Sequence, residues 1–200
     1  MTIDTEDLKT FKKYLNTIQF YLDKYFDDQK EYICCHKGCS HCCEKGSYPY
    51  SEIEFNYLML GFFSLNLEKR LEIIKRIKFL KKSYEKVENK DNFMYRCPFL
   101  GEDKVCTVYE YRGLICRTFG LLKPSKDDEI IMPFCQSLGL NYSKVYNRDE
   151  KRLDEELIKK YNYQNRPKAY QIGLKTLMSK DLLDKNEINF GEIKSLIDWL

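Results

Sequence analysis

Residues 34–43 read C-C-H-K-G-C-S-H-C-C, and the interpretation of the whole chain starts from this stretch. It holds five of the nine cysteines and both histidines of the protein. Three and two residues separate Cys35, Cys39 and Cys42, a spacing that lets one tight loop direct successive thiolates at one centre. The residues between them are polar, which is not typical of inert thiols in an apolar core. We therefore interpret the stretch as a metal-binding loop.

The other cysteines are widely spaced, and no two of them form the close pair of a zinc ribbon. They are Cys97, Cys106, Cys116 and Cys135. Cys97–Leu100 and Val105–Tyr109 are short β-prone runs separated by four residues, which predicts a hairpin. Such a hairpin would place Cys97 and Cys106 on paired strands and allow a second thiolate set. Spacing alone leaves the role of these cysteines open.

Composition and net charge exclude several classes of function. Two hundred residues, 43% hydrophobic and 32% charged, indicate one ordinary globular domain. The net charge of +3 is too small to indicate nucleic acid as a partner. The sequence contains neither an apolar run of ~18 residues nor a signal-peptide pattern. Nine cysteines in a reducing compartment are typical of metal binding or catalysis, so we expect a cytoplasmic protein whose partner is a metal ion, with no membrane contact.

Helical periodicity dominates outside the cysteine segments. A stripe from Leu8 to Tyr25 predicts a core-facing helix from about Asp4 to Tyr32. Ser51 and Glu54 form a capping-box pattern that predicts a helix to about Leu65. Further helical stripes cover residues 67–87, 153–161, 170–177 and 193–200; the first of them consists of Leu67, Leu71, Ile74, Ile77, Leu80, Tyr84 and Val87.

These patterns predict a mainly α fold, with a small β-hairpin and a cysteine-rich metal-binding loop. We expect residues 1–200 to form a single domain. Its metal-binding core would span about residues 33–136, between an N-terminal helix and a C-terminal helical tail without cysteine.

The order of the cysteine blocks resembles the YkgJ-like cysteine-cluster family (CxxCxxCC). The blocks are C-x-x-x-C-x-x-C-C at residues 35–43, C-P-F-L at 97–100, C-T-V-Y-E-Y-R at 106–112, C-R at 116–117 and a final cysteine at 135. The resemblance implies a zinc- or iron-chelating domain, and some members of the family are described as iron-sulfur proteins. Family members commonly have Arg-Pro where this chain has Arg112-Gly113.

Carried over block by block, the resemblance implies a set of metal ligands from which Cys34 is excluded. These ligands are Cys35, Cys39, Cys42, Cys43, Cys97, Cys106, Cys116 and Cys135. Neighbouring cations could stabilise the thiolates through hydrogen bonds, and the two histidines are candidate substitute ligands or donors to the ligands. The residues concerned are Lys37, Arg96, Arg112, Arg117, His36 and His41.

The sequence leaves zinc and an iron-sulfur cluster open as cofactors, with a slight preference for the cluster because the later cysteines lack close pairs. Cys35, Cys39 and Cys42 also match the spacing of radical S-adenosylmethionine enzymes, but the helix-rich pattern does not match their barrel. We therefore expect a metal-chelating protein, possessing either a redox or a structural centre. The alternatives are an enzyme similar to the protein lysine N-methylases, which contain similar cysteine blocks, and a metal-stapled interaction module; whether the chain is an enzyme stays open.

Overall fold

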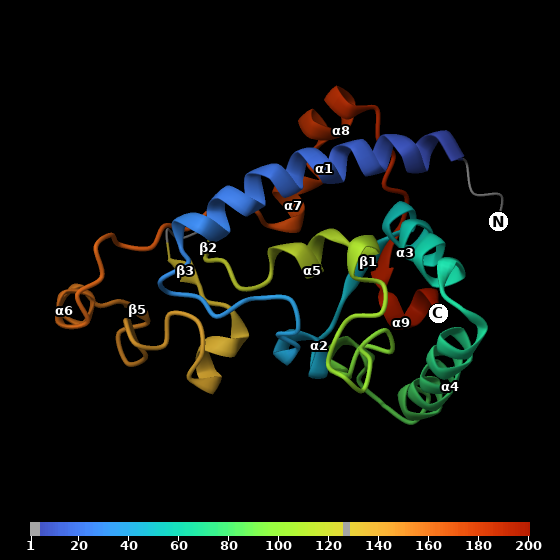
Figure 1. Cartoon of the computed structure of the whole chain (residues 1–200), viewed down its shortest axis with the longest axis horizontal. Coiled ribbons are helices and arrows are strands. Elements are labelled where there is room, and N and C mark those ends of the chain that lie inside the picture. Colours follow the sequence, from blue (N-terminus) through green and yellow to red (C-terminus); the bar gives the residue numbers. More distant parts are fainter. Residues whose placement is uncertain (1–4, 126–128) are drawn as a thin grey trace.

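The computed structural model describes residues 5–125 and 129–200 and has a mainly α fold, as predicted (Figure 1). Its α-helices are α1 (Thr5–Asp28), α2 (His41–Glu44), α3 (Glu52–Ser64), α4 (Leu67–Tyr84), α5 (Leu114–Thr118), α6 (Glu155–Lys160), α7 (Leu174–Leu177), α8 (Lys180–Asn186) and α9 (Leu196–Trp199). Short 3-10 helices cover Lys90–Asn92, Tyr109–Tyr111 and Phe134–Leu138. None of the helices in these ranges is long and apolar enough to cross a membrane.

The strands form three antiparallel pairs in the described part of the chain. They are β1 (Pro49–Ser51) with β6 (Ile193–Ser195), β2 (Lys123–Pro124) with β3 (Ile130–Ile131), and β4 (Tyr146–Asn147) with β5 (Arg152–Leu153). The first pair corrects the prediction of a helix over residues 193–200, because Ile193–Ser195 forms a strand and only Leu196–Trp199 of this range is helical. Pairing with β1 provides long-range backbone hydrogen bonds, which override local helical periodicity.

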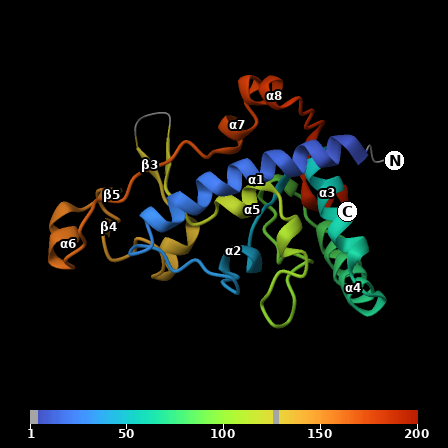
Figure 2. The ribbon, with the colours of Figure 1, turned by 45° about the horizontal axis from the view of Figure 1, so that its top comes forward.

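Helix α1 confirms the predicted core-facing stripe. It runs along the molecule beside α5 in both views (Figure 1, Figure 2). Its buried residues are Leu8, Phe11, Tyr14, Leu15, Ile18 and Leu22. The predicted start at Asp4 lies outside the described residues, and the helix ends at Asp28 rather than at Tyr32.

Helix α3 begins as the capping box predicts. The Glu54 backbone N–H donates to Ser51 Oγ, and the Glu54 carboxylate accepts from the Ser51 N–H and hydroxyl. The same carboxylate accepts from the Leu114 N–H at 2.7 Å. This buried side chain therefore connects the start of α3 to the start of α5, which carries Cys116.

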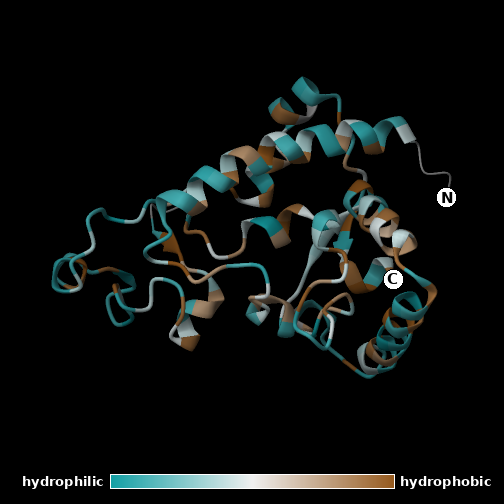
Figure 3. Ribbon diagram, viewed as in Figure 1, coloured by the Kyte–Doolittle hydropathy of each residue, from teal (hydrophilic) through white to brown (hydrophobic). Residues whose placement is uncertain are grey.

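Helix α4 was predicted correctly, but its buried face was predicted correctly only in its second half. Ile73 is the residue of this helix that is buried, whereas Leu67 and Leu71 of the predicted stripe are 64% and 56% exposed. Ile73, which is outside the predicted stripe, is buried in the second cluster, and Ile77, Leu80 and Tyr84 of the stripe pack against that cluster as predicted. Figure 3 shows both apolar and polar segments along α4, and the exposed Leu67 and Leu71 belong to the apolar ones.

The predicted hairpin between Cys97 and Tyr109 is reduced to one β-bridge, Leu100 with Cys106. Its turn is closed by the Gly101 N–H, which donates to Val105 O at 2.9 Å. Pro98 has no N–H for a ladder, and the Cys97 N–H is used by Cys43 O. The segment therefore pairs with the first cysteine block instead of extending a hairpin.

The interior consists of three hydrophobic clusters. The first cluster joins α1 to α3 and α5 and includes Phe11 and Leu114. The second cluster is built on Tyr48, Tyr50 and Phe99, with α4 and α9 around it. The third cluster, near β4 and α6, contains Tyr32, Leu122, Tyr142, Val145, Leu153 and Ile158. The cysteine loop begins two residues after Tyr32 of the third cluster, and Cys97, Cys106 and Cys116 pack against the second cluster.

Candidate metal centre

The backbone brings the two cysteine blocks together. The Cys97 N–H donates to Cys43 O at 2.8 Å, just after α2 presents Cys42 and Cys43. Gly46, three residues after Cys43, and Tyr95, two residues before Cys97, exchange both backbone hydrogen bonds at 3.0 Å. Segments that are far apart in the sequence therefore lie side by side at α2.

Four thiols form what we call the inner set: Cys43, Cys97, Cys106 and Cys116. Burial raises the pKa of Cys97 well above its ordinary value, and the negative charges of the other three raise it further. Burial also raises the pKa of Cys116 to about 12, with added effects from Cys43 and Cys106. Because a charge on one of these thiols raises the pKa of another, the four side chains lie close together.

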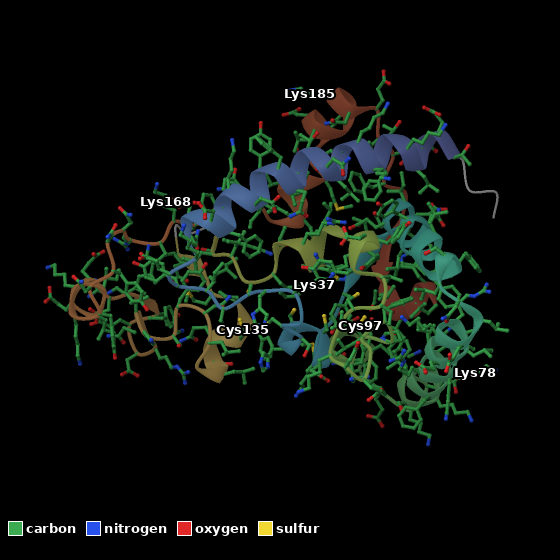
Figure 4. The ribbon with its side chains drawn as sticks, in the orientation of Figure 1. Lys37, Lys78, Cys97, Cys135, Lys168 and Lys185 are labelled. Carbon is green, nitrogen blue, oxygen red and sulfur yellow. The ribbon has the colours of Figure 1, made fainter. Side chains whose placement is uncertain are left out.

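A second group, the outer set, consists of Cys35, Cys39 and Cys135. Burial raises the pKa of Cys135 to about 12, and the charges of Cys35, Cys34 and Cys39 contribute in the same direction. Cys135 and Cys97, which are both labelled in Figure 4, lie on opposite sides of α2 in that view. Each set thus combines cysteines from the first and the later sequence block, a division that sequence spacing did not predict.

Two cavities adjoin these sets. The larger, of about 280 Å³, is lined by the outer set and by α1 residues Gln19 and Asp23. The smaller, of about 40 Å³, is lined by Cys43, Cys106 and Cys116. Cys42 lines both cavities, as do Cys39 and Cys116, so the two sets are neighbours across α2.

The thiols are gathered but do not form a finished coordination shell. Within residues 5–125 and 129–200, no three His, Cys, Asp or Glu side chains are arranged as a metal site. Thiol ligands must lose their protons when they bind a metal, and the binding energy can also reorient them. The donor chemistry fits zinc or iron, because both accept sets of cysteine thiolates. Ligation by the eight cysteines remains a prediction.

The cations proposed from the sequence have different surroundings. Arg112 lies over the Tyr109 ring, 3.4 Å from its centroid, and its charge lowers the pKa values of the Cys106 and Cys116 thiols. Arg96 instead donates to Glu44 Oε2 and to Gly101 O, each at 3.0 Å. Arg112 is therefore the arginine best placed to compensate thiolate charge at the inner set.

Arg117 mainly makes hydrogen bonds that connect parts of the fold. Its guanidinium donates to Arg112 O, Glu110 O and Gln19 Oε1, so it connects α5 to α1. Lys37 lies on the other block, with Nζ 5.6 Å from the Tyr109 ring centroid.

Both histidines line the larger cavity. His36 Nδ1 lies 2.8 Å from Cys34 O, and its ring is exposed. His41 starts α2. The positions of the rings suit contact with a ligand in the cavity, whereas their role as metal ligands remains a prediction.

Sequence reasoning missed two residues that contact cysteine sulfur. Asn141 Nδ2 lies 3.0 Å from Cys35 Sγ, and Tyr50 Oη lies 3.4 Å from Cys116 Sγ. Neither residue is in a cysteine motif, and the tyrosine-rich composition gave no reason to single out Tyr50. The Cys34 thiol is also closer to the outer set than its exclusion from the motif indicated, with Sγ 3.0 Å from Asn141 Oδ1.

The raised thiol pKa values predict a pH dependence for the metal-free, reduced protein. Burial raises the pKa of Cys106 from 9.0 to about 11 and that of Cys116 to about 12. The folded state therefore retains protons that the unfolded chain loses, so the free energy of unfolding should be greatest below the unfolded pKa and fall as pH rises toward 12. Urea unfolding across this alkaline range measures the decline. Cys116→Ser should make it shallower, and a pH-independent free energy would contradict the burial of these thiols.

Comparison with known proteins identifies one family model. CxxCxxCC, described as "Putative zinc- or iron-chelating domain", matches residues 34–136. This range includes both sets and all nine cysteines. No curated protein and no solved structure matches the chain.

Proposed function

Because the chain belongs to the CxxCxxCC family of zinc- or iron-chelating domains, we propose that it holds metal at two unequal centres. The inner set is a closed structural centre. The outer set, completed by Cys42, is an accessible centre that carries the function. The observation that supports this division is the space beside each set, about 40 Å³ against about 280 Å³.

The surroundings of the inner set favour a structural role. The space there is small, about 40 Å³, so it suits a single ion better than a larger group. Cys97, Cys106 and Cys116 pack against the second cluster, and Cys43 adds a fourth thiolate from α2. Four thiolates around one ion leave no open position, which is typical of structural sites.

The surroundings of the outer set favour a reactive role. The larger cavity has room for an iron-sulfur cluster, or for one ion with an exchangeable ligand. Its wall includes His36, His41 and Asp23, which can contact a molecule that approaches the centre. We propose an iron-sulfur cluster here, which when bound would supply one-electron transfer. The high thiol content fits the reducing cytoplasm as its location.

Metal and sulfide analysis of the anaerobically purified full chain tests this function. We expect iron together with acid-labile sulfide, and a brown protein whose visible absorption bleaches on reduction. A colourless protein with stoichiometric zinc and no sulfide, from cells able to load iron, would exclude the cluster. A brown protein that resists reduction would exclude electron transfer.

Removing the metal should loosen both blocks together. The Cys97 N–H bond to Cys43 O joins them, and ligand binding is coupled to folding. Hydrogen exchange should therefore increase at Cys97 and Tyr95 as well as within residues 34–43 when a chelator removes the metal. Full protection of residues 95–97 in the metal-free protein would contradict a shared unit.

A further inference from the structure

Asn141 has an orientation that its backbone contacts define. The Cys34 N–H donates to Asn141 Oδ1 at 2.9 Å, and Asn141 Nδ2 donates to Gly120 O at 3.1 Å. With the amide oxygen and nitrogen fixed in this way, Nδ2 is also the atom that faces Cys35 Sγ, at 3.0 Å. The side chain is 2% exposed, so water does not compete for this bond.

The backbone at Gly120 makes this approach possible. Gly120 has φ of +98°, a conformation that side-chain-bearing residues rarely adopt. A Cβ atom at this position would overlap the Cys35 sulfur and lie 3.1 Å from Asn141 Nδ2. The Cys35 sulfur thus lies between the backbone of Gly120, which has no side chain, and the amide group of Asn141.

Tyr50 faces a cysteine sulfur of the inner set, as Asn141 does at the outer set. The Gly113 N–H donates to Tyr50 Oη at 3.1 Å, so the phenol oxygen already acts as an acceptor. Its own hydrogen is then available to Cys116 Sγ, 3.4 Å away. A proline at position 113, common in the family that the sequence resembles, has no N–H and could not make the first of these bonds. Tyr50 is 2% exposed.

We propose that Asn141 and Tyr50 are positioning residues, each holding one thiolate ligand through a neutral hydrogen bond: Asn141 for Cys35 of the outer set and Tyr50 for Cys116 of the inner set. This inference rests on the proposed metal centres. Thiolate accepts such a bond better than a thiol does, and neither donor adds charge. Residues that hydrogen-bond to metal ligands typically change metal affinity 10–100-fold when replaced.

If Asn141 and Tyr50 only stabilised the fold, replacing either one would weaken both centres. Two variants distinguish this structural role from an effect on one thiolate. Asn141→Asp keeps the oxygen that accepts from Cys34 N–H but presents a carboxylate oxygen to Cys35. Tyr50→Phe removes one hydroxyl and preserves the packing in the second cluster. If the residues act through sulfur, each variant should affect the centre that it contacts and spare the other.

Cobalt titration of the metal-free, reduced full chain provides the readout. Co²⁺ serves as the probe, and thiolate-to-cobalt absorption reports sulfur ligation at each centre. Asn141→Asp should weaken one binding step roughly 10–100-fold, and Tyr50→Phe the other. The two steps are assigned with Cys35→Ser and Cys116→Ser.

Double variants determine whether the effect passes through the sulfur. In a Cys35→Ser background, Asn141→Asp should have little further effect on cobalt binding, and Cys116→Ser should likewise suppress the effect of Tyr50→Phe. Equal losses with and without the cysteine, or losses at both centres from either variant, would overturn the inference. If the unmodified chain shows no sulfur-based cobalt absorption, the proposed metal centres themselves fail; normal wild-type binding with unaffected variants rejects only the positioning roles.

Discussion

Replacing Cys35 and Cys135 together with serine should remove one metal centre and leave the other, although these residues come from opposite ends of the cysteine-rich region. They belong to the same outer set. Replacing Cys35 and Cys97 together should remove both centres, because this pair takes one ligand from each set. Elemental analysis of the purified variants should show that the first pair loses the iron and acid-labile sulfide of the outer centre and keeps the single ion of the inner centre, whereas the second pair keeps close to no metal.

If the two centres were instead divided by sequence block, the two pairs of substitutions would have the same effect. Cys35 belongs to the first block, whereas Cys135 and Cys97 belong to the later one, so both pairs would then remove both centres. Equal loss from the two pairs therefore contradicts the inner and outer sets. Cys34→Ser is the control: it changes a cysteine outside the eight proposed ligands and should leave the metal content nearly unchanged.

Glu54→Ala should strongly reduce the free energy of unfolding, by about 3 kcal/mol or more. The substitution removes the acceptor of the Ser51 and Leu114 N–H groups, both buried. Leu114 starts α5, so the variant should also weaken the placement of Cys116. Urea denaturation of the metal-loaded and metal-free proteins measures the two effects separately.

Glu68→Ala is the matched control for this prediction. Glu68 also lies in the first turn of a helix, but it is exposed at the start of α4. Its removal should cost no more than about 1 kcal/mol, the usual size of a charge effect at a helix terminus. A similar, small cost for both variants would mean that the Glu54 carboxylate does not connect α3 to α5 as described.

Sequence patterns predicted a helix correctly where interactions between residues close in the sequence determine its structure. The capping box at Ser51 depends on residues within one turn, and α1 has a single apolar stripe, so both were predictable. In α4, apolar residues occur on several faces, and the second cluster selects Ile73 over Leu71 through contacts from distant segments. β6 likewise depends on a partner strand far away in the sequence.

The same distinction applies to the candidate centre. The motif singled out the candidate cysteines, but their division into sets depends on α2, where Cys42 lines both cavities and Cys43 lines only the smaller one. Asn141 contributes through a contact with a residue 106 positions earlier, and a single asparagine leaves no pattern in the sequence. Only the folded chain brings the Asn141 side chain to the Cys35 sulfur.

X-ray absorption at the metal edge, recorded on the anaerobically purified full chain, tests the central claim most directly. With eight cysteines in two sets, we predict a first shell of sulfur around the bound metal, at about 2.3 Å if that metal is zinc. This result would hold for either zinc or an iron-sulfur cluster, because cysteine sulfur ligates both. A first shell dominated by nitrogen or oxygen, or a protein that binds no metal tightly, would contradict the account.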